Sequence, residues 1–307
     1  MEKKKRKANN GTFFTVPVIV SGLILLFIIF CAVFAKFIAP YSPESNDYTA
    51  SLVKAFSPGH ILGTDRLGRD LLSRLLCGAQ TSIINAFLIV GFEVIVGVPI
   101  GMLCGYYGGK LDTMIMRVWD VISAVPSLLL AFVLVAAFGK GTYSGVLAIG
   151  IVYTPLTAKL ARSLIMTEKK AVYVEACKSL GYSDLRIIFI HILPNIITTM
   201  IAQFTLDIGS AITSMATLSY LGIGVQPPGA DWGTLLKDGM SMLYMNPVLL
   251  IAPALAIMIT SIAINVFSDG IQSYIDPGQR KMPTFKQYRK KLLIPAGAAF
   301  KKKEEVA

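Results

Sequence analysis

Six long apolar segments constrain the fold of this 307-residue chain more than any other feature. A helix needs about 20 mostly apolar residues to cross roughly 30 Å of hydrocarbon, and each segment has that length. The segments run from Val16 to Ile38, Ser82 to Tyr106, Val118 to Phe138, Tyr143 to Leu164, Asn195 to Val225 and Pro247 to Phe267. The sequence therefore predicts an all-α membrane protein with six transmembrane helices.

The composition and the distribution of charge agree with a membrane location. Apolar residues make up 54% of the chain and charged residues 15%, and the mean hydropathy of +0.63 exceeds that of a typical soluble domain. The net charge is +11, but lysine and arginine gather at the two ends and in a few short connections rather than on one continuous face. This bias indicates membrane topology with both termini cytoplasmic, and it argues against nucleic acid as a partner.

Three regions are expected along the chain. Residues 1–78 hold a cytoplasmic tail, the first transmembrane helix and an outer amphipathic segment, and residues 79–270 hold a core of five helices. Residues 271–307 form a basic cytoplasmic tail that can contact anionic lipid headgroups. Residues 64–76 are predicted to form an amphipathic helix at the outer interface. Its apolar side carries Leu67, Leu71 and Leu75, and its charged side carries Arg69, Asp70 and Arg74.

The connection between the fourth and fifth segments, residues 168–194, carries the functional argument. It is predicted to form two short helices that meet at a bend, where Gly181 supplies the left-handed conformation that ends the first helix. Ser183 or Asp184 can cap the second helix, and Pro194 closes the loop. The second helix has one apolar face, made of Leu185, Ile188, Phe189, Ile192 and Leu193. Such a face without a partner in its own loop indicates a docking surface.

The same loop resembles the cytoplasmic loop of bacterial ABC importer permeases, in which E-A-A is followed by three residues, G, nine residues and I-x-L-P. This chain matches that pattern with Glu175-Ala176-Cys177, Gly181 and His191-Ile192-Leu193-Pro194. It departs from the pattern in Cys177 and His191. Residues 60–79 and 218–233 are similar to segments of the C-type permease of dipeptide, oligopeptide and nickel importers. The resemblance extends from Phe13 to Asp276.

The resemblance implies the type-1 ABC importer permease fold and a multi-pass place in a bacterial or archaeal inner or plasma membrane. It implies a permease subunit that forms the path for dipeptides or oligopeptides delivered by an extracytoplasmic binding protein. A nickel chelate or another small solute is the alternative cargo. The expected partners are a sister permease subunit and two cytoplasmic ATPase subunits. The sequence has no G-x-x-x-x-G-K-[ST] element, so the ATPase subunits are expected to use ATP and magnesium.

No cofactor is expected on this chain, which is therefore interpreted as a transport subunit rather than an enzyme. No paired nucleophile and base points to a catalytic site, and His60 and His191 are too isolated in the sequence to suggest a metal site. The resemblance implies that the ATPase-coupling residues are Glu175, Ala176, Cys177, Gly181, Leu185, Ile188, Phe189, Ile192 and Pro194.

Polar residues within the apolar segments suggest two further sites. Spacings of three and four residues put one set on a single stripe of the fifth helix, and the sixth helix adds three more. This set is Gln203, Asp207, Ser210, Ser214 and Thr217 with Ser261, Asn265 and Ser268. The stripe lines the translocation path, or it hydrogen-bonds to the sister subunit; the sequence leaves both open.

A second set lies on one face of the second helix, with a spacing of four residues. It consists of Glu93, Gly97, Gly101 and Gly105. The small residues are expected to let another helix come close, with Glu93 directed at a serine, threonine or backbone partner. A different class of function remains as an alternative, an ion-coupled secondary transporter in which Asp207 and Glu93 carry protons.

Overall fold

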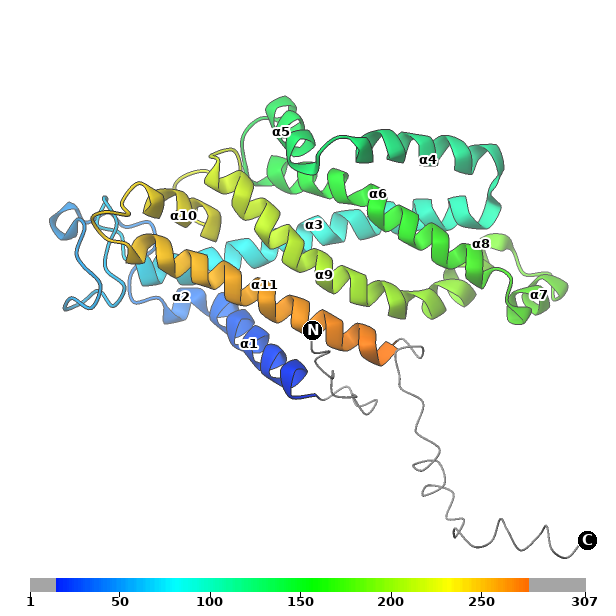
Figure 1. Ribbon diagram of the computed structural model, residues 1–307, viewed down its shortest axis with the longest axis horizontal. Coiled ribbons are helices and arrows are strands. Elements are labelled where there is room, and N and C mark those ends of the chain that lie inside the picture. Colours follow the sequence, from blue (N-terminus) through cyan, green and yellow to red (C-terminus); the bar gives the residue numbers. More distant parts are fainter. Residues whose placement is uncertain (1–14, 276–307) are drawn as a thin grey trace, which may run out of the picture.

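A computed structural model describes residues 15–275, which form an elongated helical bundle with no β-strand in that range (Figure 1). The elements are α1 (Val16–Val33), α2 (Ala35–Ile38), η1 (Tyr48–Ala50), α3 (Leu71–Tyr107), α4 (Gly109–Ala124), α5 (Ser127–Phe138), α6 (Thr142–Glu168), α7 (Val172–Ser179), α8 (Asp184–Arg186), η2 (Ile187–Ile192), α9 (Leu193–Tyr220), α10 (Trp232–Met240) and α11 (Val248–Ile275). The all-α class is confirmed. The basic N-terminal run and most of the predicted tail, residues 271–307, lie outside the described residues.

The described helices account for five or six membrane crossings. Helices α1, α3, α6 and α11 and the continuous stretch from α8 to α9 are each long and apolar enough to cross a membrane. The predicted third span, residues 118–138, is not one straight helix, because α4 and α5 meet at an angle of 97°. Pro126 lies at this break; it has no backbone N–H to donate, and its ring disfavours helical geometry at Val125.

The packing of α3 against α6 is the tightest helix contact in the bundle. Glycines four residues apart on α3 face the backbone of α6, and a methyl group on any of them would meet α6 atoms. A Cβ on Gly97 would lie 3.0 Å from the Thr154 carbonyl oxygen, and one on Gly101 would collide with the Ala158 carbonyl. The two helices therefore lie close together along this glycine face, and both belong to this same chain.

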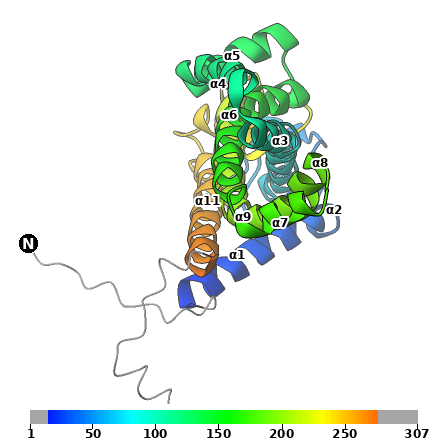
Figure 2. The same cartoon turned by 90° about the vertical axis from the view of Figure 1, so that its right-hand side faces the viewer.

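The remaining long helices surround this pair. Helix α9 packs against α3, α6 and α11, while α1 lies outside them against α11 and α3 (Figures 1 and 2). Most apolar side chains of α1 are exposed, as expected for a helix that faces lipid. The α7 turn lies at one end of the bundle, and α10 with residues 39–70 lies at the other (Figure 1).

The predicted amphipathic helix over residues 64–76 is wrong in its first half. Residues 64–70 form a closed turn with positive φ at Gly68, and the helix begins at Leu71 as the first turn of α3. Asp70 caps this helix by accepting a hydrogen bond from the Ser73 backbone N–H at 2.8 Å. Asp70 and Arg74 are buried rather than facing water, and both form ion pairs, Asp70 with His60 and Arg74 with Asp65.

Substitution of Gly101 tests the tight helix contact. Gly101→Ala places a methyl group against the α6 backbone, where no flexible side chain can give way, and overpacking of this kind costs about 1–3 kcal/mol. The apparent melting temperature of the solubilised protein should fall. Gly91→Ala is the matched control, because nothing lies within 4 Å of a Cβ at that position of the same helix. Equal melting temperatures for the two variants would contradict the contact.

Candidate functional site

The bend in the connecting loop forms as the sequence predicts. Gly181 has a φ of +77° and follows Leu180, the C-cap of α7, at a position where few residues other than glycine fit without strain. Its backbone N–H donates to the Lys178 carbonyl at 2.9 Å. Ser183 is the N-cap of α8 in an extended conformation, but its side chain makes no capping bond. The Asp184 side chain instead accepts a hydrogen bond from the Tyr106 hydroxyl at 2.8 Å, which ties the turn to the end of α3.

Pro194 lies at the start of the next long helix, α9, but no break in the helix marks the end of the loop there. The second loop helix does not stop there, because α8, η2 and α9 form one continuous stretch from Asp184 to Tyr220. The segment Ile187–Ile192 is a π-helix, whose wider turn relieves the contact that a proline ring makes with the preceding turn. Pro194 therefore sits inside a helical stretch, in the first turn of α9.

The predicted apolar docking face is divided between the interior and the surface. Ile188 and Ile192 are fully buried within the chain, so they cannot be the surface that meets a partner. They pack in a hydrophobic cluster at the ends of α3 and α6 with Val98, Met102, Ala161, Ile165 and Val174. These two isoleucines are buried because the ends of α3 and α6 pack against them. The loop sequence alone does not show this contact.

A different set of apolar residues is left at the surface of the turn. Val172 is 81% exposed, Leu180 72% and Leu185 56%. Phe189, Glu175, Ala176 and Gly181 are also exposed, whereas Cys177 is buried. Glu175 makes no side-chain hydrogen bond or ion pair with the part of the chain that the structure describes. Burying one leucine side chain on association is worth about 1.5–3 kcal/mol, so this surface can contribute substantially to docking.

Polar contacts fasten the turn to the membrane helices, and the sequence did not predict them. Lys169 donates to the carbonyl oxygens of Gly105 and Tyr106, at 2.7 and 3.1 Å, and thereby caps the end of α3. The Tyr173 hydroxyl donates to Glu168 at 2.9 Å, and burial raises the pKa of the Tyr173 phenol. The only sequence signal for these bonds was the clustering of polar groups at the inner ends of the spans.

His191, which departs from the general family pattern, takes part in an aromatic stack. Its ring lies 5.4 Å from the Tyr182 ring with an interplanar angle of 6°. The Arg186 guanidinium lies over the same tyrosine ring at 4.4 Å from the centroid. The stack joins the bend to the π-helix, which accounts for an aromatic ring at position 191.

The two acidic residues predicted within the spans lie together in the interior. Glu93 of α3 is 1% exposed and Asp207 of α9 is 7% exposed, and the two carboxyl groups are neighbours. The Thr157 hydroxyl donates to Glu93 at 3.1 Å, and the Gln203 amide donates to Asp207 at 2.9 Å. The partner of Glu93 in the structure is thus a threonine of α6, and the acid pair with its two donors links α3, α6 and α9.

The predicted polar stripe is only partly a surface. Ser214 shares a 2.8 Å hydrogen bond with the Tyr153 hydroxyl of α6, and the buried Ser268 donates to the Ala202 carbonyl at 2.7 Å. Ser210 and Asn265 are exposed at the surface of this chain. Thr217 and Ser261 are half-buried. One edge of the stripe thus turns inward with Asp207, and the other edge is open to a solute path or to a second subunit.

The class of this helical membrane protein follows from its similarity to known families. Residues 97–281 match the family described as binding-protein-dependent transport system inner membrane component. Residues 17–57 match the N-terminal transmembrane domain of oligopeptide transport permease C. The chain belongs to this family of ABC importer permeases and is a multi-pass inner-membrane protein that works with ATPase and binding-protein partners.

Curated relatives and solved structures agree with this assignment. The chain is 37% identical over 259 residues to a glutathione transport system permease protein of Pectobacterium atrosepticum, covering 84% of this chain and 86% of that protein. It is 39% identical over 260 residues to a di/tripeptide transport system permease protein of Pseudomonas aeruginosa, covering 83% and 86%. An inward-facing structure of the MetNI methionine ABC transporter matches with a TM-score of 0.54 at 16% identity, over 66% of this chain and 96% of that one.

The structural match supports the predicted type-1 importer fold. Together with family membership, it disfavours the ion-coupled secondary transporter. The acid pair of Glu93 and Asp207 is therefore no reason to assign a proton-driven carrier.

Removal of the Thr157 hydroxyl, which donates a hydrogen bond to Glu93, should lower the stability of the folded protein. Thr157→Val leaves the buried carboxyl without its donor, and an unsatisfied buried polar group costs about 1–3 kcal/mol. Thr154→Val is the matched control, because Thr154 is equally buried on α6 but bonds only to the Gly150 carbonyl of its own helix. The melting temperature of the solubilised protein should fall more for Thr157→Val, and the opposite order would contradict the Glu93 contact.

Thiol labelling tests whether the polar stripe lines the translocation path or packs against the sister subunit. In a protein without its native cysteines, Ser210→Cys should react with a membrane-impermeant reagent in at least one nucleotide state of the assembled transporter. Ser268→Cys should stay unreactive, because Ser268 is fully buried. If Ser210→Cys is protected in every state, the open edge of the stripe packs against the sister subunit.

Proposed function

We propose that this chain is the C-type permease subunit of an ATP-driven importer for short peptides. It pairs with a sister permease to form the transmembrane path, and an extracytoplasmic binding protein delivers the solute. Relatives named for dipeptide, di/tripeptide and glutathione transport support peptide as the cargo class. ATP and magnesium are used by two partner ATPase subunits, and both termini of this chain are cytoplasmic.

The observation that carries the proposal is the division of the loop into an exposed tip and a fastened base. The tip presents Val172, Leu180 and Leu185 to a partner. The base is packed into the cluster of Ile188 and Ile192 with the ends of α3 and α6. A displacement of the tip is therefore transmitted to the membrane helices, because closely packed groups move together rather than deform.

Alternating access follows from this connection. ATP binding closes the two ATPase subunits and moves the docked turn, and the turn carries α3, α6 and α9 with it. The inner end of the path then closes while the outer end opens toward the binding protein. The open edge of the stripe at Ser210 and Asn265 is the part of this chain that faces the path.

A charge placed on the exposed tip tests the docking surface. Leu185→Glu should reduce the amount of ATPase that co-purifies with the tagged permease from native membranes by about tenfold or more, because docking would then bury a carboxylate in place of the leucine side chain. Ser179→Glu is the control, since Ser179 is an exposed polar residue of the neighbouring helix α7. The sister permease should remain bound to both variants. Unchanged ATPase recovery with Leu185→Glu would refute the proposed docking surface.

A further inference from the structure

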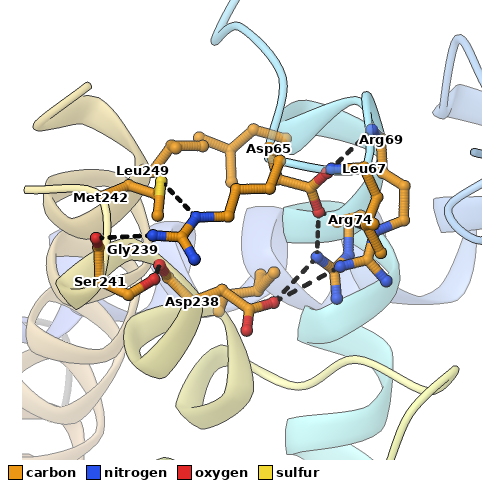
Figure 3. A pocket seen from close by; sticks show the side chains of 12 residues that line it. Asp65, Leu67, Arg69, Arg74, Asp238, Gly239, Ser241, Met242 and Leu249 are labelled. Carbon is orange, nitrogen blue, oxygen red and sulfur yellow. Dashed lines mark hydrogen bonds and ion pairs between the residues drawn. The ribbon is translucent and has the colours of Figure 1, made fainter. Parts of the chain in front are cut away.

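A charged pocket of about 240 Å³ lies at the end of the bundle opposite the α7 turn (Figure 3). It is formed where the turn over residues 64–70 and the first turn of α3 meet α10 and the start of α11. Its apolar walls include Leu71, Leu235 and Leu249, and its charged groups are Asp65, Arg66, Arg69, Arg74 and Asp238. Three arginines against two aspartates give the lining a formal charge of +1.

Two of the arginines are neutralised within the pocket. Asp65 accepts from the Arg69 Nε and the Arg74 Nη1, each at 2.7 Å. Asp238 of α10 accepts from the same Arg74 nitrogen at 3.1 Å and lies 3.6 Å from Arg69 (Figure 3). Arg74 is 3% exposed, and its Nε is buried without a hydrogen-bond partner in the described part of the chain. These four groups form a rigid, nearly neutral wall with one donor left unused.

Arg66 is the arginine that this arrangement leaves without a counter-ion. Its Nε donates to the Met242 sulfur at 3.0 Å and its Nη2 to the Ser241 carbonyl at 3.3 Å. It pairs with no carboxylate among residues 15–275. A thioether is a weak acceptor, so most of the donor capacity of this guanidinium is unused. Arg66 is an exposed residue, and these two contacts place its guanidinium against Ser241 and Met242 in the pocket lining.

We propose that this pocket binds a carboxylate group through Arg66, as a recognition site at the outer end of the permease. A planar guanidinium binds a carboxylate with two parallel hydrogen bonds, and the leucine walls accommodate the apolar atoms beside it. The volume suits about one amino-acid residue, because sites for drug-sized molecules start near 300 Å³. The carboxylate is either the terminus of a short peptide or an acidic side chain of the binding protein.

This inference rests on the proposed function in one respect, because the proposed topology is what places the pocket on the outer side of the membrane. Binding is measured on the complete transporter purified from native membranes into lipid nanodiscs. Binding of dialanine and of its C-terminal amide is detected by saturation-transfer NMR. Binding of the binding protein is detected by interferometry. Arg66→Gln is compared with Lys237→Gln, which removes the same charge from an exposed position on α10 outside the pocket lining.

If the peptide is the ligand, dialanine gives a signal, the amide does not, and Arg66→Gln weakens dialanine binding about tenfold or more while Lys237→Gln does not. If a protein side chain is the ligand, Arg66→Gln weakens association of the binding protein by a similar factor, again without an effect of Lys237→Gln. Equal effects of the two variants, or no effect of Arg66→Gln on either probe, overturn the proposal. ATP-driven uptake by the same preparation shows separately whether the proposed function holds.

Discussion

The contact between α3 and α6 is the constraint on which the rest of the structure depends. Glycines at 97, 101 and 105 bring the two backbones together, because lipid provides no hydrophobic force to join helices and close packing must do so. Once the helices are that close, Thr157 reaches Glu93 at 3.1 Å, and Lys169 reaches the last carbonyl groups of α3. The inner ends of the same two helices then provide the surface that buries Ile188 and Ile192 of the connecting loop. The docking turn is therefore held by the membrane core itself.

This arrangement separates the two requirements of a coupling element. The exposed residues Val172, Leu180 and Leu185 are accessible to a partner, and in the proposed function the buried isoleucines transmit its movement. The stack of His191 on Tyr182 ties the bend to the π-helix η2, and the bond from Tyr106 to Asp184 ties it to the end of α3. A turn held only by its backbone would move without carrying the membrane helices with it.

The sequence predicted features that depend on residues close together in the chain. The spans follow from hydropathy, the glycine face of α3 from a spacing of four, and the bend from Gly181. The sequence could not predict features that depend on contacts between residues far apart in the chain. The ion pair between Arg74 and Asp238 joins positions 164 residues apart, and it accounts for the burial of an arginine that the sequence placed on a water-facing side. The burial of Ile188 and Ile192 was missed for the same reason, since their partners lie in other spans. The sequence also could not show that Arg66 lacks a carboxylate partner among the described residues, because that depends on how Asp65 and Asp238 pair with the other two arginines.

The central claim is that this permease is driven by ATP through its docking turn, and solute uptake by proteoliposomes tests it most directly. The complete transporter is reconstituted with its binding protein outside, and radiolabelled dialanine is added with ATP inside the vesicles or with an imposed proton gradient and no ATP. The account predicts accumulation that requires both ATP and the binding protein and is indifferent to the gradient. Accumulation driven by the proton gradient in the absence of ATP would contradict it and would return Glu93 and Asp207 to the role of proton carriers.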